Sequence, residues 1–369
     1  MPLRLALALL SITSTLSLIP STQAAYSLKT QYAGDNFFDG WSFWGNRDNL
    51  TNGAVNYVSE AQSQDLAYLN SAGNAIIKVD NSSTVAYGGL RDSVRITTND
   101  AYGIGSLFVF DALHTPYGCS VWSSMWSHAR EWPSGGEIDI MEGVNLQTVN
   151  QVALHTVTGC YAESTEPSTS PNGLLASTNC DHSVNANQGC TFTDTRNVSY
   201  GAALAENGGG IFAAELSSDA ISVWFFPRAQ IPSDLRDSSS SPDPTGWGAP
   251  TAYYPQSTCN INQFFAAQQL TINIALCGDW AGQPGVFNPT CSGVCTDMVM
   301  DPRNYDTAYF EIASVRIYEG GNDTRNKAAA SAVIGSIGGG DSGVSGGERL
   351  GRGGLALIAL AASAMLYSL

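Results

Sequence analysis

The sequence predicts an all-β protein, and three observations support this fold class. Glycine is abundant, with 38 residues, and aromatic residues make up 10% of the chain. Short apolar runs alternate with polar residues and are broken by Gly, Asn, Ser and Pro, whereas helical periodicity is scarce. Many short strands joined by turn-rich connections are typical of a β-sandwich or a β-barrel.

The predicted strands follow one another through most of the chain. They are Asp92–Thr97, Ser106–Ala112, Cys119–Trp126, Glu137–Val144, Gln151–Thr156, Ile211–Leu216, Ala220–Phe226, Leu270–Leu276 and Thr307–Tyr318. The short turn Ser217-Ser218-Asp219 predicts a hairpin between the two strands that flank it. The sequence shows no internal repeat, and the strand pattern is uniform, so residues 25–320 are interpreted as one domain.

Composition and charge exclude several classes of function. Hydrophobic residues make up 43% of the chain, which is enough for a core and argues against disorder. The formal net charge is -16. Because such a surface repels a phosphate backbone, we expect no nucleic-acid partner. A neutral or cationic partner is compatible with this charge.

Both ends of the chain resemble targeting segments. Residues 1–24 combine Arg4, an apolar stretch and the small-residue site Thr22-Gln23-Ala24, which indicates a secretory signal peptide. A buried first helix is the alternative. Residues 321–354 form a Gly/Ser-rich linker, and residues 355–369 form a terminal apolar tail. This pattern predicts a GPI-anchor signal whose tail is removed, and a true membrane tail is the alternative. We therefore expect a secreted protein that is tethered to the cell surface or cell wall.

Cysteines and glycosylation sequons agree with the secretory route. The eight cysteines are an even number and predict disulfides, although their pairing does not follow from the sequence. Cys291 and Cys295 would also suit half of a zinc site, but no histidine lies near them. Four sequons begin at Asn49, Asn81, Asn197 and Asn322.

The segment Gly135–Gly143 contains three carboxylates in what otherwise reads as a buried strand. Glu137 and Asp139 are two residues apart and therefore share a face, with Ile138 and Ile140 directed to the core. Glu142 lies five residues from Glu137, which in a regular strand would place it on the opposite face. A β-bulge at Ile140-Met141 would bring all three acids to one face, and we predict one there.

Three carboxylates on one face cannot all ionise freely, so repulsion raises the pKa of at least one of them. A proton donor beside a carboxylate is the equipment of glycoside hydrolysis with retention of configuration. We assign Glu137 as nucleophile, Glu142 as general acid and then base, and Asp139 as the residue that tunes Glu137. The spacing alone leaves two alternatives open, a calcium site and a solvated edge strand.

Three tryptophans precede these acids, namely Trp122, Trp126 and Trp132. Aromatic faces stack on the apolar faces of sugar rings, and core packing is the alternative role for each residue. His114, His128 and His182 are interpreted as structural or surface residues.

At these residues the sequence resembles glycoside hydrolase family 16, in particular the secreted laminarinases of basidiomycetes. The motif Glu-x-Asp-x-x-Glu is met by Glu137, Asp139 and Glu142. Further blocks that resemble the family in order along the chain are Gly34–Gly40, Val55–Val58, Gly89–Arg95, Tyr117–Cys119, Ala153–Thr156, Val223–Arg228 and Leu276–Gly282.

The resemblance implies a β-jelly-roll sandwich of the concanavalin A type, with a concave sheet that forms a glycan cleft. It also implies that His155 approaches the acid pair from the leaving-group side, with a structural histidine as the alternative. Trp126, Trp132 and Trp280 are similar to cleft residues, and Asn36 is similar to a residue that hydrogen-bonds a glycosyl unit. The linker and tail fall outside the resemblance.

The sequence thus predicts a retaining endo-β-glucanase that acts on β-1,3-glucan or mixed β-1,3/1,4-glucan. A cell-wall transglycosylase and a non-catalytic glucan-binding surface protein are the alternatives. We expect a monomer that needs no cofactor, with a membrane association only through the anchor. A structural calcium ion is left open.

Overall fold

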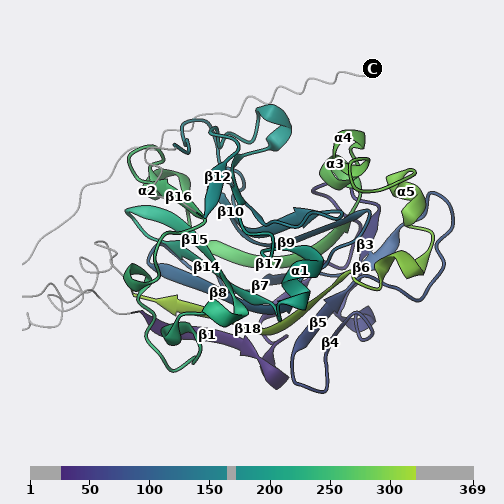
Figure 1. The fold of residues 1–369 in the computed structure, drawn as a ribbon, viewed down its shortest axis with the longest axis horizontal. Helices are drawn as coiled ribbons and strands as arrows, with labels where there is room; N and C mark the ends of the chain where they lie inside the picture. Colours follow the sequence, from purple (N-terminus) through teal and green to yellow (C-terminus); the bar gives the residue numbers. More distant parts are fainter. Residues whose placement is uncertain (1–25, 164–171, 321–369) are drawn as a thin grey trace, which may run out of the picture. The chain divides into compact units, whose positions relative to one another are not determined.

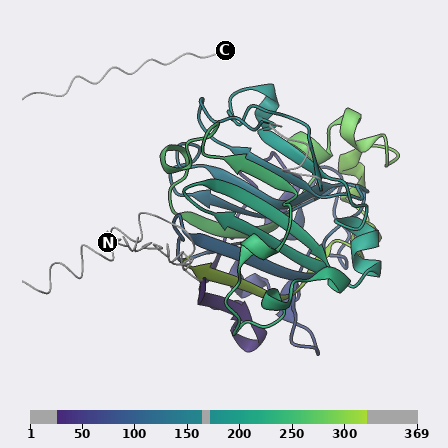
Figure 2. The same cartoon turned by 60° about the vertical axis from the view of Figure 1, so that its left-hand side comes forward.

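Two antiparallel sheets of eight strands stack face to face in the computed structural model, which describes residues 26–163 and 172–320 (Figure 1). The β8 sheet has the strand order β16 (Ala252–Pro255), β15 (Ala220–Pro227), β14 (Gly210–Leu216), β8 (Ser106–His114), β18 (Tyr309–Glu319), β5 (Ala75–Lys78) and β4 (Ala67–Leu69). Its eighth strand, β1 (Ser27–Ala33), also pairs with β18, and Figure 2 shows β1 in purple beside the yellow-green β18.

The β10 sheet has the order β12 (Gly173–Leu175), β13 (Cys190–Asp194), β11 (Gln151–His155), β10 (Glu137–Val144), β9 (Val121–Ala129), β17 (Gln268–Leu276), β7 (Arg95–Thr98) and β2 (Trp41–Phe43). A parallel pair is formed by β3 (Val55–Tyr57) and β6 (Arg91–Ser93).

The helices of the described residues are short and lie between strands. They are α1 (Gly201–Glu206), α2 (Ile261–Phe264), α3 (Gly278–Ala281), α4 (Pro284–Phe287) and α5 (Cys295–Met298). Single 3-10 turns are η1 (Gly34–Asn36), η2 (Glu60–Gln62), η3 (Asn185–Asn187), η4 (Arg228–Gln230), η5 (Ser233–Leu235), η6 (Pro244–Gly246) and η7 (Pro302–Tyr305). Among the described residues there is no helix both long enough and apolar enough to cross a membrane.

The main core lies between the two sheets. Phe108, Phe110 and Phe212 of the β8 sheet pack in one cluster with Met125 and Ile138 of the β10 sheet. The β8 sheet has a second apolar cluster on its other face, which explains why every residue of β15 is buried. The β10 sheet instead carries Trp, Ser, His and acidic side chains on its outer face, and several of them are partly exposed, so this face is the one available to a ligand.

The structure confirms the all-β class and most of the predicted strands. Residues 137–144 form β10 as predicted, and β14 pairs with β15 across the predicted hairpin turn. The segment predicted as Asp92–Thr97 divides into β6 and β7, because β6 pairs with β3 whereas β7 pairs with β17. β9 begins at Val121 rather than Cys119, since Ser120 has a positive φ of 79° that no strand accommodates.

The eight cysteines form four disulfides, Cys119–Cys291, Cys160–Cys259, Cys180–Cys190 and Cys277–Cys295. Cys291 and Cys295 thus belong to two different disulfides, which removes the zinc interpretation. The signal peptide of residues 1–24, the linker 321–354 and the tail 355–369 lie outside the described residues.

Candidate active site

The predicted β-bulge is present in β10. Along β9, Asp139 faces Trp126 and Met141 faces Met125, so Ile140 has no partner there. The pairing of β10 with β11 shifts over the same residues, between Asp139 and Glu142. Ile138, Ile140 and Met141 are fully buried in the core, while Glu137, Asp139 and Glu142 share the outer face.

The side chain of Asn150 fills the gap that the bulge leaves in the hydrogen-bond ladder. Its Oδ1 accepts from the backbone N–H of Glu142 at 2.9 Å, and its Nδ2 donates to the carbonyl of Ile140 at 3.1 Å. The backbone N–H of Asn150 donates to Ser199 Oγ at 2.9 Å, which holds the residue itself. The amide thus replaces the strand partner that both backbone groups lack, and it fixes the backbone position of Glu142.

Glu142 and Glu137 are each held by a tryptophan. Trp122 Nε1 donates to Glu142 Oε1 at 2.8 Å, and Ser124 Oγ donates to the same oxygen at 3.2 Å. Trp132 Nε1 donates to Glu137 Oε2. Because neutral donors hold both carboxyls, their orientation is set without the cost of burying a second charge.

Asp139 forms an ion pair with His155, whose Nε2 lies 3.2 Å from Asp139 Oδ2. The other ring nitrogen, Nδ1, lies 2.9 Å from Asn187 Oδ1. With a carboxylate beside Nε2 and an amide oxygen at Nδ1, the surroundings of the ring favour the imidazolium form. His155 and Asp139 are both buried.

Burial and mutual repulsion keep protons in this site near neutral pH. Burial, and then the charge of Asp139, raise the pKa of Glu137 to about 7. Burial, and then the charge of Glu142, raise the pKa of Asp139 to about 6. Burial likewise raises the pKa of Glu142. For His155, burial lowers the pKa, but Asp139 and the two glutamates outweigh it and raise the pKa to about 10.

Two histidines that the sequence analysis set aside lie at the site. His128 faces Glu137 across the β9–β10 pair, and its ring centroid lies 4.9 Å from that of Trp126. His182 packs edge-on against Trp132 at 5.1 Å. Neither was distinguishable in the sequence, because their relation to Glu137 depends on strand register and on a loop conformation.

The predicted cleft residues differ in how closely they approach the acids. Trp126 is 8% exposed, and its Nε1 donates to Asn273 Oδ1 at 2.7 Å. Trp132 is 43% exposed, so much of its ring is available to a ligand. Trp280 lies in α3, edge-on to Trp122 at 5.5 Å. Asn36 is exposed in η1, and within residues 26–163 and 172–320 it makes no hydrogen bond to the three carboxylates.

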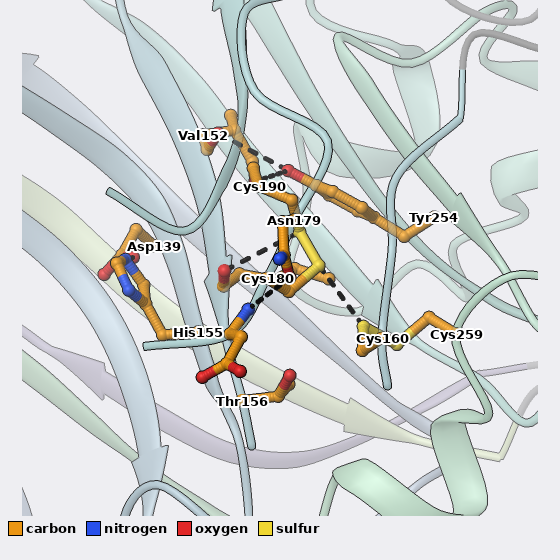
Figure 3. Close-up of a disulfide and its surroundings, with 12 residues drawn as sticks. Asp139, Val152, His155, Thr156, Cys160, Asn179, Cys180, Cys190, Tyr254 and Cys259 are labelled. Carbon is orange, nitrogen blue, oxygen red and sulfur yellow. Dashed lines mark hydrogen bonds and ion pairs between the residues drawn. A yellow bond between two sulfur atoms is a disulfide. The ribbon is translucent and has the colours of Figure 1, made fainter. Parts of the chain in front are cut away.

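A disulfide closes the loop that reaches His155. Cys180 and Cys190 bracket residues 181–189, which include both Asn187 and His182. The second disulfide of this region, Cys160–Cys259, packs against the first, with Cys160 Sγ 3.3 Å from Cys180 Sγ (Figure 3). Tyr254 donates to the carbonyl of Cys190 at 3.0 Å and braces the loop from behind. The loop is therefore anchored at its base, where His182 and Asn187 contact the site.

Glu137, Asp139 and His155 bring one potential ligand atom each within 4.8 Å of one another. A metal ion would require His155 to lose its proton, which the raised pKa of the ring opposes.

The family model for the XgeA-like catalytic domain of glycoside hydrolase family 16 matches residues 41–318, a span that contains the whole β10 sheet. The chain belongs to glycoside hydrolase family 16. This confirms the family that the sequence resembled, together with its jelly-roll sandwich.

The family 16 domain is similar to several curated fungal proteins. It is 38% identical over 305 residues to a protein of Schizosaccharomyces pombe named "Probable glycosidase", covering 81% of this chain and 71% of that protein. It is 36% identical over 340 residues to a "Probable endo-1,3(4)-beta-glucanase" of Neosartorya fischeri, covering 88% of this chain and 50% of the relative. The alignment thus spans only half the length of the second relative.

Two solved structures of family 16 enzymes resemble this domain over their whole length. Laminarinase 16A of Phanerochaete chrysosporium, solved with β-glucans in its donor and acceptor sites, gives a TM-score of 0.76 at 36% identity. A structure described as an elongating β-1,3-glucosyltransferase of the family gives 0.72 at 34% identity. Each match covers 80% of this chain and 100% of the other.

Proposed function

We propose that this protein is a retaining endo-glycosidase that hydrolyses β-1,3-glucan, mixed β-1,3/1,4-glucan or both. The observation that carries the proposal is the bulge in β10, which places Glu137, Asp139 and Glu142 on one outer face. Relatives named endo-1,3(4)-β-glucanases and a laminarinase holding β-glucan support this substrate class.

The first half-reaction uses both glutamates. The carboxylate of Glu137 attacks the anomeric carbon and forms a glycosyl ester, while the bond to the leaving oxygen breaks. Glu142 gives its proton to that oxygen. Because Glu142 Oε1 accepts bonds from Trp122 and Ser124, the proton to be donated is on Oε2.

In the second half-reaction, the ionised Glu142 takes a proton from water, whose oxygen attacks the anomeric carbon and releases Glu137. Two inversions restore the original configuration. Asp139 lies between the two glutamates, and its negative charge is partly balanced by the ion pair with His155. This pair limits the negative charge beside Glu137 and favours the ionised nucleophile.

A timed digestion of laminarin and of mixed-linkage glucan, with products sized by mass, tests the proposal. The wild-type protein should yield shorter oligosaccharides, and the Glu142→Gln variant should yield none at the same concentration. Folded wild-type protein that binds glucan without cleaving it would instead favour the glucan-binding surface protein.

A transglycosylase is the second candidate, and the similarity to a structure described as an elongating β-1,3-glucosyltransferase supports it. It shares the first half-reaction, but a sugar hydroxyl replaces water in the second. The digestion separates the two, because transfer yields products longer than the substrate.

We infer from the terminal segments that the protein is secreted and GPI-anchored, and we expect it to act as a monomer without a cofactor. Release of the intact protein from cells by a phosphatidylinositol-specific phospholipase would support the anchor. Unchanged activity after dialysis against a chelator would support the absence of a metal requirement.

A further inference from the structure

A continuous row of directly opposed residues crosses the outer face of the β10 sheet away from the acids. Glu142 of β10 faces Ser124 of β9, and Ser124 faces Asn273 of β17. Asn273 in turn faces Arg95 of β7. Trp44 directly follows β2, and its backbone N–H donates to the carbonyl of Arg95 at 3.0 Å. Trp44 is thus the last member of a row that begins at the general acid.

The indole of Trp44 is fixed in place yet partly open to solvent. The guanidinium of Arg95 lies over the ring, 4.9 Å from its centroid, and Trp44 Nε1 donates to the carbonyl of Arg47 at 2.9 Å. The side chain is nevertheless 42% exposed. An aromatic ring held in this way offers a rigid surface to a ligand at little entropic cost.

Arg95 connects this ring to the central part of the site. It is 7% exposed, its guanidinium also lies over Trp126 at 5.9 Å, and its Nη1 donates to Asn49 Oδ1 at 3.1 Å. Its Nε has no partner in the described part of the chain although it is buried. Packed against Trp44 and Trp126 and bonded to Asn49, the guanidinium fixes the distal ring relative to the centre of the site.

We propose that Trp44, with Arg95 behind it, forms a distal glucosyl-binding subsite. This inference rests on the proposed function and extends it to the length of glucan that is recognised. Four strand spacings separate β10 from β2, which amounts to about 19 Å across the sheet. A glucan that spans the row from Glu142 to Trp44 contains several glucosyl units, so the subsite contributes only to longer substrates.

The test compares kcat/KM for laminarioligosaccharides from the trimer to the heptamer in wild type and in Trp44→Ala. The wild-type value should rise with length, and Trp44→Ala should lose roughly three- to tenfold of kcat/KM on the longest substrates only. Tyr87→Ala is the control, because Tyr87 is an aromatic side chain with 81% exposure that lies outside the β10 sheet. This variant should match wild type at every length.

An equal loss on trimer and heptamer, or no loss at all, would overturn the subsite while leaving the hydrolase intact. A second measurement makes the result independent of turnover. Laminariheptaose binding to Glu142→Gln is compared by calorimetry with binding to the double variant that adds Trp44→Ala. The double variant should bind the heptamer more weakly and the trimer equally well, and equal heptamer affinity would refute the inference.

Discussion

Replacing Asn150 by alanine should show how much the side-chain amide of this residue stabilises the bulge. The substitution leaves the partly buried N–H of Glu142 and the buried carbonyl of Ile140 without a partner in the bulge. An unsatisfied buried backbone group costs about 1–3 kcal/mol, so the two together predict a loss of roughly 2–6 kcal/mol of stability. That is a large fraction of a typical domain stability of about 5–15 kcal/mol.

The catalytic effect follows from the position of Glu142. Without its anchor, the carboxyl moves relative to the leaving oxygen, and a displacement of about 1 Å predicts a roughly hundredfold fall in kcat. Initial rates on laminarin, measured where thermal melts show the variant fully folded, isolate this effect from the lost stability.

Asn70→Ala is the control for this experiment. Asn70 Oδ1 likewise accepts from two backbone amides, those of Ala72 and Asn74, but it lies between β4 and β5 of the other sheet. Its loss should lower the melting temperature and leave kcat unchanged. If Asn150→Ala retained the wild-type kcat, or if both variants lost the same factor, the argument that the amide positions Glu142 would be wrong.

Three further predictions concern the acids and the loop above them. Glu137→Gln should lower kcat by roughly three orders of magnitude or more, with laminariheptaose binding retained as evidence that the variant folds. The free energy of unfolding should fall as pH rises from 4.5 to 7. Glu137 has a pKa of about 7 in the folded protein, above its ordinary value of 4.5, so in this range the folded protein holds a proton that the unfolded chain has lost. Thermal melts across this range should show the fall in wild type and a shallower one in Glu137→Gln, and parallel curves would contradict the assignment. Asn187→Ala should move the acidic limb of the kcat/KM profile to higher pH, because a less well held His155 imidazolium stabilises the ionised Glu137 less. Asn185→Ala is the control, because Asn185 is exposed in the same loop and its φ of 51° is close to the 59° of Asn187. This variant should leave the acidic limb where it is.

The sequence predicted those parts of the site that lie on one strand. The parity of Glu137, Asp139 and Glu142 was enough to place the bulge, because side chains alternate strictly along a strand. The same reasoning directed Ile138 and Ile140 to the core, as the structure confirms.

Features that join separate segments could not be predicted in this way. Asn150 and Asn187 lie in connections, and only the folded chain brings them to Ile140 and His155. The disulfide pairing was open for the same reason, since Cys119 and Cys291 are 172 residues apart. Short strands such as β2 and β12 were missed because three residues carry too little periodicity.

The unpartnered Ile140 makes the bulge the one point where β10 tolerates a change in length without moving an acid to the other face. Another apolar residue at this position keeps the side chain in the core and leaves the acids on their face. Deletion of Ile140 would let β10 pair with β9 without interruption, since Met141 and Glu142 would keep their partners and Glu142 would stay on the outer face. Deletion of Ile138 would instead place Glu137 and Asp139 on opposite faces of the sheet while leaving every carboxylate in the sequence.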